Sequence, residues 1–305
     1  MLIDHVITMC DRRYGEHVFA SHPCNHCGQP ERCESNIARA KEKNEPHGCF
    51  QCCYDIHYCQ NGGRTDYSCD HLFNYYLCRY SCKYCSEILY ALETIDLSQY
   101  PMFNLISLGC GPSPDLMAFD YLHDRGLPQK NIFYLGCDIN KGWANIHNCI
   151  REYSLNRGYS VNYLYYDVMD LLTNRMLLQG YNVVIVQYLI SHFINTKQKV
   201  LLKSFFGGII EKFVAVKATG SPLLIVLNDI DHYKARNHFY RLAEMLREQG
   251  YHIKVNAKHF KDKLYLKNST QYYSQANKFN CMPDFVRRYS CALECTSVQL
   301  IIEVE

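Results

Sequence analysis

The hydrophobic and polar positions of this chain follow two different patterns that meet near residue 95. After that point, short apolar runs alternate with segments in which apolar residues recur every three or four positions. Such alternation predicts strands joined by helices, in parallel βα units. Before it, the chain is rich in Cys, His, Asn and Tyr and shows little apolar periodicity. We therefore predict one domain over 1–95 and another over 96–305.

The second part contains seven apolar runs and four periodic segments. The runs predict strands at 103–109, 131–139, 161–168, 181–189, 222–229, 251–257 and 297–305. The periodic segments predict helices at 114–126, 143–158, 198–213 and 234–250. This order predicts an α/β fold with a doubly wound, mostly parallel seven-stranded sheet, preceded by a small, metal-stabilised, loop-rich domain. A basic and aromatic insertion over 258–296 precedes the last strand, which could run antiparallel and close the sheet at one edge.

Cysteine is concentrated in the first part of the chain. Twelve of the 18 cysteines lie at or before Cys85, and CNHC (24–27) and CFQCC (49–53) contain pairs with the spacing of zinc knuckles. Because no secretory signal is visible, we interpret these residues as metal ligands and expect two or three zinc ions. A disulfide-rich secreted module and unligated thiols are the alternatives, and the pairing into sites stays open. The predicted ligands are Cys24, Cys27, Cys33, Cys49, Cys52, Cys53, Cys59, Cys69, Cys78, Cys82 and Cys85.

The segment CRYSCKYC (78–85) allows a second interpretation. Its three-then-two spacing is that with which radical enzymes hold an iron–sulfur cluster that cleaves S-adenosylmethionine (SAM). Such triplets usually follow the first strand of a βα barrel, whereas the preceding SCDHLFNYYL does not have the pattern of a strand and a loop. We therefore favour zinc, and keep a radical SAM enzyme that uses Cys78, Cys82 and Cys85 as a lesser alternative.

Charge and hydropathy narrow the range of partners. The sequence has no run of 18 apolar residues and no N-terminal signal pattern, so we expect no membrane partner and a cytoplasmic location. The net charge is +2, and the most basic stretch, 251–295, interleaves lysines with aromatic residues. That composition suits phosphates and unstacked bases. A solvated face over ordinary core aromatics explains the same pattern.

The turn SLGCGPSPD (107–115) follows the first predicted strand. Gly109 and Gly111 allow a tight turn and close approach of a ligand to the backbone, while Pro114 suits the first position of a helix. Asp138 ends the second strand, where a carboxylate can accept both hydroxyls of a ribose, and Asp167 ends the third. A turn residue or a helix cap is the structural alternative for each acid.

Together, LISLGCGPSPDLMAF, YLGCDIN, YYDVMDL and VVIVQYLISHF resemble the successive motifs of the class I SAM-dependent methyltransferases, over about residues 100–305. The resemblance implies a seven-stranded sheet with SAM over the carboxyl ends of its first, second and fourth strands. It implies that Gly109, Cys110 and Gly111 lie along the methionine part of SAM. It further implies that Asp138 holds the ribose and that Asp167 faces adenine.

The fourth strand continues into QYLISHF. The resemblance places Gln187 near the methyl donor, and Tyr188 and His192 are candidates for orienting or deprotonating a nucleophile. A packed aromatic ring and a satisfied histidine are the alternatives. Two positions depart from the family, because Ser107 stands where an acid is usual and Ser113 where a third glycine is frequent. The chain also lacks the Asn/Asp-Pro-Pro-aromatic tetrapeptide of many DNA amino-group methyltransferases, which disfavours that substrate.

These features predict a SAM-dependent methyltransferase that acts on RNA or another nucleic acid, with a zinc module that binds the substrate or a protein partner. One alternative is a catalytically inactive scaffold of the same fold, which Ser107 permits. The other is the radical SAM enzyme described above.

Overall fold

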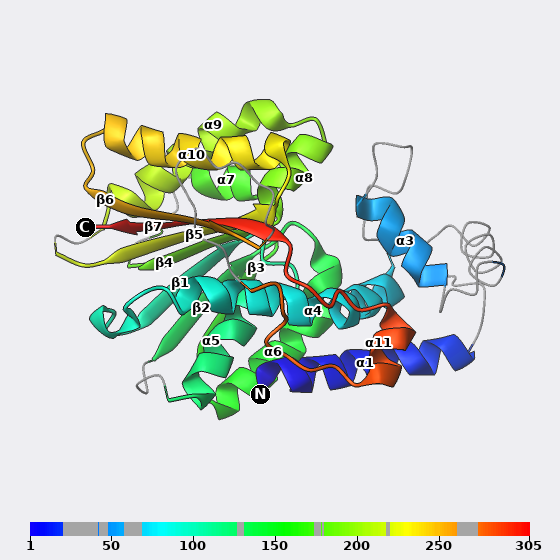
Figure 1. The fold of residues 1–305 in the computed structure, drawn as a ribbon. Helices are drawn as coiled ribbons and strands as arrows, with labels where there is room; N and C mark the ends of the chain where they lie inside the picture. The colour runs from blue at the N-terminus through cyan, green and yellow to red at the C-terminus, as the bar shows by residue number, and fades with distance from the viewer. Residues whose placement is uncertain are drawn as a thin grey trace.

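A seven-stranded sheet forms the centre of the computed structural model, which describes residues 1–20, 42, 48–57, 69–126, 131–173, 178, 180–217, 220–260 and 274–305 (Figure 1). Its order is β3-β2-β1-β4-β5-β7-β6, as expected for an α/β, mostly parallel sheet of the class I methyltransferase type. The strands are β1 (Phe103–Leu108), β2 (Ile132–Cys137), β3 (Ser160–Leu164), β4 (Val183–Gln187), β5 (Leu223–Ile230), β6 (Ile253–His259) and β7 (Ser297–Val304).

The last strand, β7, runs antiparallel to both of its neighbours, β5 and β6. Its predicted place at the edge of the sheet is wrong, because it is inserted between these two strands. Seven of its eight residues are buried, so it needs a partner strand on each side. Strand β6 is only partly buried along most of its length and therefore takes the edge.

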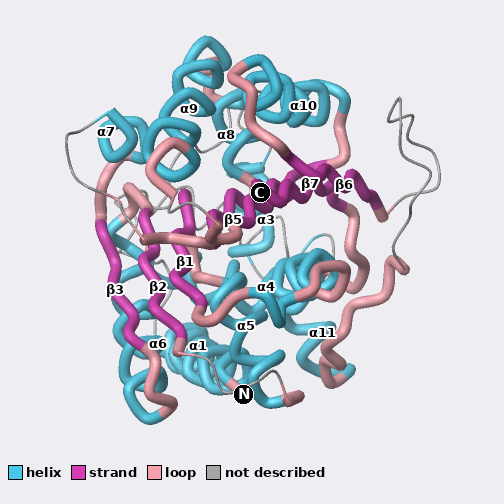
Figure 2. The backbone as a smooth tube through the Cα atoms, turned by 90° about the vertical axis from the view of Figure 1, so that its left-hand side faces the viewer, coloured by secondary structure: helices cyan, strands magenta, loops and turns pink. Residues whose placement is uncertain are grey.

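Helices cover both faces of the sheet, as Figures 1 and 2 show. One face carries α1 (Leu2–Ala20), α4 (Asp70–Leu92), α5 (Pro114–Asp124) and α6 (Ala144–Asn156), with α3 (Gly48–His57) and α11 (Pro283–Tyr289) beside α4. The other face carries α7 (Val168–Thr173), α8 (Leu189–Asn195), α9 (Leu202–Ile209) with a π-helical turn (Ile210–Val214), and α10 (Tyr233–Glu248). Short 3-10 turns lie at Leu97–Gln99, Lys141–Trp143 and Lys199–Leu201. No helix among the described residues is long and apolar enough to cross a membrane.

The described part of residues 1–95 differs from the loop-rich domain that we expected. It consists mainly of helices, and α1 and α4 share one core with the sheet. The backbone N–H of Leu2 donates to Asp120 on α5 at 2.6 Å, and Tyr14, Tyr75 and Cys85 are fully buried. The expectation failed because we counted cysteine and tyrosine as ligands and polar residues, whereas here they fill the core as apolar side chains.

This shared core yields a prediction about unfolding. Leu89 is fully buried on α4, so Leu89→Ala should lower the free energy of unfolding of the whole chain by about 2–5 kcal/mol. Chemical denaturation followed by circular dichroism should show one transition that moves to lower denaturant. Leu155→Ala is the control, because Leu155 on α6 is 76% exposed and its removal should cost less than about 0.5 kcal/mol. Two transitions, only one of which moves, would show that the N-terminal helices form an independent unit.

Candidate functional site

The glycine turn lies between β1 and α5, at the carboxyl edge of the sheet. Gly109 and Gly111 have φ values of 72° and 48°, and the N–H groups of Gly109 and Cys110 donate to the carbonyl of Cys137 at 2.8 and 3.0 Å. Strand β1 pairs with β2 on one side and with β4 on the other. The order of the strands therefore reverses at β1, since β2 and β3 lie on one side of it and β4 and β5 on the other. Ligands of doubly wound sheets bind in the crevice at this switch point.

Asp138 follows β2 and fixes the glycine turn. Its two carboxylate oxygens accept from the backbone N–H groups of Gly111 at 2.9 Å and Asn140 at 2.8 Å. Burial raises the pKa of this carboxyl, and the two N–H groups oppose that rise. Each oxygen has a second lone pair, so the carboxylate can still accept a hydroxyl. The residue thus has the turn role that we gave as an alternative, and it remains able to bind a ribose.

His147 on α6 contacts the same turn, and we did not predict this role from the sequence. Its Nε2 lies 2.7 Å from the carbonyl oxygen of Gly111, and its Nδ1 lies 3.0 Å from the hydroxyl of Tyr165. The ring stacks on Tyr163 with 3.7 Å between centroids. Burial lowers the pKa of His147 to about 4, so at neutral pH an uncharged ring donates from Nε2 to Gly111 and accepts at Nδ1.

A buried carboxylate lies next to Ser107, the position where an acid was expected. Asp115, in the first turn of α5, accepts from the hydroxyl of Tyr134 at 3.0 Å and is hydrogen-bonded to Ser107. Burial raises the pKa of Asp115, and the bond from Ser107 opposes that rise. Ser113 adopts a left-handed conformation and approaches Tyr163 at 3.1 Å, with no side-chain cap on α5. The serine at position 107 is therefore accompanied by a buried acid eight residues later.

The other two predicted cofactor contacts also lie at the carboxyl edge. Asp167 is partly exposed and accepts from the N–H of Met169 at 2.7 Å, so it caps the start of α7. Gln187 donates from Nε2 to the carbonyl of Tyr84 on α4 at 3.0 Å. Its Oε1 is buried and has no hydrogen-bond partner among the described residues. That oxygen is available to a donor on a ligand.

A cavity of about 870 Å³ opens between α4, the carboxyl ends of β4 and β5, and the segment before β7. Its walls include six aromatic rings, from Phe50, Tyr54, Tyr76, Tyr80, Tyr84 and Tyr188. Tyr76 also packs on Trp143, whose ring faces Gly111, so the cavity adjoins the glycine turn. Both predicted catalytic residues, Tyr188 and His192, line it. The volume is within the range of small-ligand sites.

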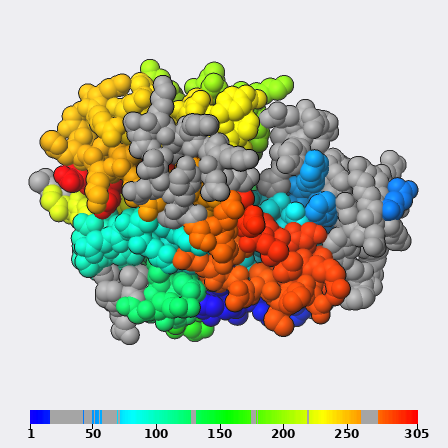
Figure 3. Space-filling model, in the orientation of Figure 1, coloured from blue at the N-terminus to red at the C-terminus, as the bar shows by residue number. Residues whose placement is uncertain are grey.

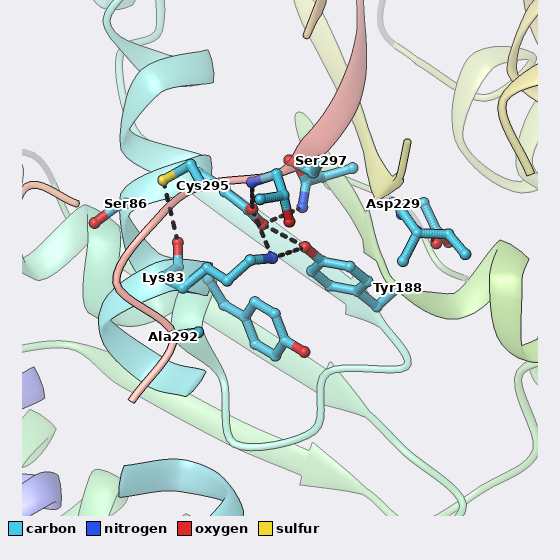
Figure 4. Close-up of polar contacts among 12 residues, drawn as sticks. Lys83, Ser86, Tyr188, Asp229, Ala292, Cys295 and Ser297 are labelled. Atoms are coloured by element: carbon cyan, nitrogen blue, oxygen red, sulfur yellow. Dashed lines mark hydrogen bonds and ion pairs between the residues drawn. The ribbon is translucent and has the colours of Figure 1, made fainter. Parts of the chain in front are cut away.

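A buried ion pair lies at one side of this cavity, where its lysine, Lys83, is part of the lining (Figure 4). Lys83 contacts Glu87 one turn later on α4 at 2.8 Å and also bonds to the hydroxyl of Tyr188. Glu87, which is completely buried, accepts from Tyr188 at 2.8 Å, from Asn228 of β5 at 3.1 Å and from the N–H of Thr296 at 3.1 Å. The i,i+4 spacing of Lys83 and Glu87 is visible in the sequence. We missed it because we interpreted this segment as metal-binding.

The two catalytic candidates have different chemistry. Burial and the neighbouring Glu87 raise the pKa of Tyr188 well above its usual range, so its phenol stays protonated. Its one proton is donated to Glu87, so the phenol can position an acceptor only by accepting a hydrogen bond from it. Removal from water lowers the pKa of His192, so its ring is neutral at pH 7 and can accept a proton. Tyr188 also has a φ of 58°, and such left-handed residues often occur at functional sites.

The structure does not gather the predicted metal ligands that it describes. No group of three or more His, Cys, Asp or Glu side chains in the described ranges is arranged to hold a metal ion. Cys49, Cys52 and Cys53 lie on α3, and Cys69 directly precedes α4. The cysteines of CRYSCKYC lie on α4 itself, where Cys78, Cys82 and Cys85 are buried against different neighbours. Cys24, Cys27, Cys33 and Cys59 lie outside the described residues.

The described part of the basic stretch 251–295 is largely paired and packed. Lys254 contacts Glu303 at 3.2 Å, and Lys278 contacts Glu93 at 2.7 Å. Arg288 contacts Asp11 at 2.8 Å, and the aromatic rings of Phe260 and Tyr289 are buried. These residues follow the alternative of a solvated face over core aromatics. Lys261, Lys263 and Lys267 lie outside the described residues.

No protein-family model and no curated protein matches this chain. Among solved structures, it is similar to the plantazolicin methyltransferase BpumL in complex with SAH, at 10% identity and TM-score 0.39, over 76% of this chain and 84% of that one. It is also similar to precorrin-6y C5,15-methyltransferase from Geobacter metallireducens, at 13% identity and TM-score 0.38, over 72% and 86%. A third similar structure is a SAM-dependent methyltransferase from Archaeoglobus fulgidus, at 12% identity and TM-score 0.39, over 72% of this chain and 94% of that one. Because these values are low, we infer function from the residues of this chain.

The lowered pKa of His147 yields a prediction about pH. Between pH 6.5 and about 4 the unfolded histidine binds a proton and the folded one does not, so stability is lost as pH falls through this window. The full loss amounts to about 3 kcal/mol. In His147→Gln, whose amide can still donate to Gly111, this contribution should disappear. The fall in free energy of unfolding between pH 7.5 and 4.5, measured in urea, should then be about 2 to 3 kcal/mol smaller than in the wild type.

The exposed His252, replaced by Gln, is the control for this comparison. Other groups titrate in the same window, such as Asp229, whose pKa burial raises to about 6, but they are common to both proteins and cancel in the difference. Equal pH dependence of wild type and His147→Gln would contradict the buried neutral ring.

Proposed function

We propose that the protein transfers a methyl group from SAM to an acceptor bound in the cavity. The carrying observation is the glycine turn at the β1/β4 switch point, where Asp138 accepts from the N–H of Gly111, and where the rings of Trp143 and Tyr76 lead from the turn to an aromatic cavity. SAM supplies a methyl group on a positively charged sulfur. Two glycines with positive φ leave the backbone of the turn open to a ligand, and the sheet places Asp138 at the end of the neighbouring strand, β2.

The residues of the turn and strand ends would hold the cofactor in this proposal. Gly109, Cys110 and Gly111 would lie along its methionine part, and Asp138 would accept from the ribose hydroxyls. Asp167, at the end of β3, would face adenine. The buried Oε1 of Gln187 could accept from the ammonium group of the methionine end, because that oxygen has no partner among the described residues.

The acceptor would lie in the cavity, between the aromatic rings of its walls and Lys83. His192, neutral at pH 7, would take the proton that the acceptor loses when it is methylated. The phenol of Tyr188, held by Lys83 and Glu87, would orient the acceptor by a hydrogen bond.

RNA, or another nucleic acid, is our proposed acceptor class. The support is the aromatic wall of the cavity, since rings of tyrosine stack on unpaired bases. The described cations of 251–295 give no support, because they pair with carboxylates of the protein itself.

A zinc module remains part of the proposal, with substrate or protein recognition as its role. It is supported by the spacing of the cysteines outside the described residues, namely Cys24, Cys27, Cys33 and Cys59, together with the α3 cysteines. Cysteines 69, 78, 82 and 85 are buried, and their burial is accounted for without a metal.

Replacement of Asp138 tests the cofactor assignment. Asp138→Ala should weaken SAM binding at least about 10-fold, because a carboxylate–hydroxyl bond contributes about 1.5–3 kcal/mol. Titration calorimetry gives the affinity, and native mass spectra of the same samples count bound SAM and zinc. Asp170→Ala, an exposed acid on α7, is the control. Thermal unfolding of both variants separates loss of binding from loss of the turn that Asp138 also fixes.

Unchanged affinity in Asp138→Ala would refute the ribose assignment. A wild-type protein that binds no SAM would favour the inactive scaffold, for which the serine at position 107 is the sequence argument. Bound iron and sulfide would instead favour the radical enzyme.

Methyl transfer itself tests the acceptor and the role of His192. Labelled methyl groups from SAM should enter RNA in a ribonuclease-sensitive form, and His192→Gln should lower the rate at least about 10-fold. His252→Gln is again the control. A rate unaffected by His192→Gln would remove that residue as the base, whereas SAM binding with no label in RNA would point to another acceptor.

A further inference from the structure

Three cysteine thiols, to which the proposed function gives no role, meet beside α4. Cys82 of α4 and Cys281 have their sulfur atoms 3.2 Å apart, although 199 residues separate them in the chain. The thiol of Cys281 is also hydrogen-bonded to that of Cys291. Cys281 lies just before α11 and Cys291 just after it, so this short helix is bracketed by two thiols that converge on a third.

The backbone holds the two sides of this thiol cluster in place. Arg79 of α4 donates to the carbonyl of Tyr289 at 3.1 Å, and the N–H of Ala292 donates to the carbonyl of Arg79 at 3.0 Å. The N–H of Lys278 donates to Ser86 at 2.9 Å. Figure 3 shows the C-terminal segment, orange to red, lying at the surface beside α4 in cyan. The thiols are therefore brought together by bonds that do not involve sulfur.

The three thiols differ in their exposure to solvent, and this difference determines which of them an oxidant can reach. Cys281 and Cys291 are partly exposed, whereas Cys82 is buried behind them. An oxidant from solvent can reach Cys281, and the thiol of Cys82 is already in contact with it. This is the arrangement of an oxidation-sensitive cysteine beside a resolving cysteine.

We propose that Cys82, Cys281 and Cys291 form a peroxide-sensitive thiol cluster in which Cys281 and Cys82 close to a disulfide. Hydrogen peroxide transfers one oxygen to the sulfur of Cys281, its O–O bond breaks, and water leaves. The thiol of Cys82 then attacks the sulfenic acid, the S–S bond forms and a second water leaves. In total two thiols and one peroxide give one disulfide and two waters, and the two electrons lost by sulfur reduce the peroxide.

The disulfide would act on the cavity of the candidate site. The cavity lining includes Cys291, Ala292, Leu293, Glu294 and Thr296. A covalent bond from Cys82 on α4 to Cys281, just before α11, would fix the segment that carries Cys291 against α4, which forms the opposite wall of the cavity. Oxidation would therefore restrict access to the cavity, whatever ligand it takes.

The experiment is peptide mapping of the full chain after mild peroxide treatment. Trypsin places Cys82, Cys281 and Cys291 on three different peptides, 80–83, 279–287 and 289–305. We expect the first two to appear joined, two hydrogens lighter than their sum, and to separate on reduction. The cross-link should raise the Tm by about 5 °C or more, because it closes a very long loop of the unfolded chain.

Three variants make the result specific. Cys281→Ser should abolish the cross-link, and Cys291→Ser should leave it. Cys295→Ser is the matched control, because Cys295 lies in the same segment but its thiol faces the carbonyl of Lys83 and the side chain of Asn277. If Cys281→Ser does not fold, Cys82→Ser tests the same bond from the other side.

Three outcomes would overturn the proposal. In the first, Cys82 and Cys281 stay reduced while other thiols oxidise. In the second, they oxidise only to sulfinic or sulfonic acid. In the third, native mass spectra show a metal ion whose removal is required before these thiols react. None of these readouts depends on methyl transfer, so they are independent of the proposed function.

Discussion

The buried carboxylate of Glu87 is the group on which the carboxyl edge of the sheet, beside the cavity, depends. A charge removed from water is strongly unfavourable unless it is paired and hydrogen-bonded. Here the pairing needs Lys83 of the same helix, Tyr188 after β4, Asn228 of β5 and the backbone before β7. Removal of one partner from such a pair typically costs about 3–5 kcal/mol, which makes the relative placement of these four elements strongly specified.

The same logic holds the other half of the site. Gly109 and Gly111 have no side chains that could anchor the turn, so the position of these residues depends on groups that bind their backbone. Asp138 accepts from the N–H of Gly111, and His147 lies within hydrogen-bond distance of the carbonyl of the same residue. Both are buried or partly buried and both have shifted pKa values because burial disfavours their charged forms. The glycine turn, where we propose that the cofactor binds, is therefore preorganised by polar side chains, while the cavity is shaped by aromatic ones.

The N-terminal part of the chain shows how composition can mislead. Cysteine and tyrosine carry chemistry, and a segment rich in both looks like a metal site. In α1 and α4 they instead supply the apolar surface that joins these helices to the sheet. The thiol cluster around Cys281 does bring cysteines into contact, but they are 199 residues apart in the chain and do not belong to one sequence motif.

The sequence by itself determined the sheet, the glycine turn, the acids at the ends of β2 and β3, and the candidates Tyr188 and His192. These follow from local patterns, since hydrophobic periodicity and strand ends are set within a few residues. Only the tertiary structure decided that β7 is inserted beside β5, that Asp115 lies next to Ser107, and that His147 supports the turn. It alone paired Lys83 and Glu87 with the end of β4 and brought Cys82 to Cys281. These features depend on contacts between distant segments, and such contacts leave no periodic trace in a single sequence.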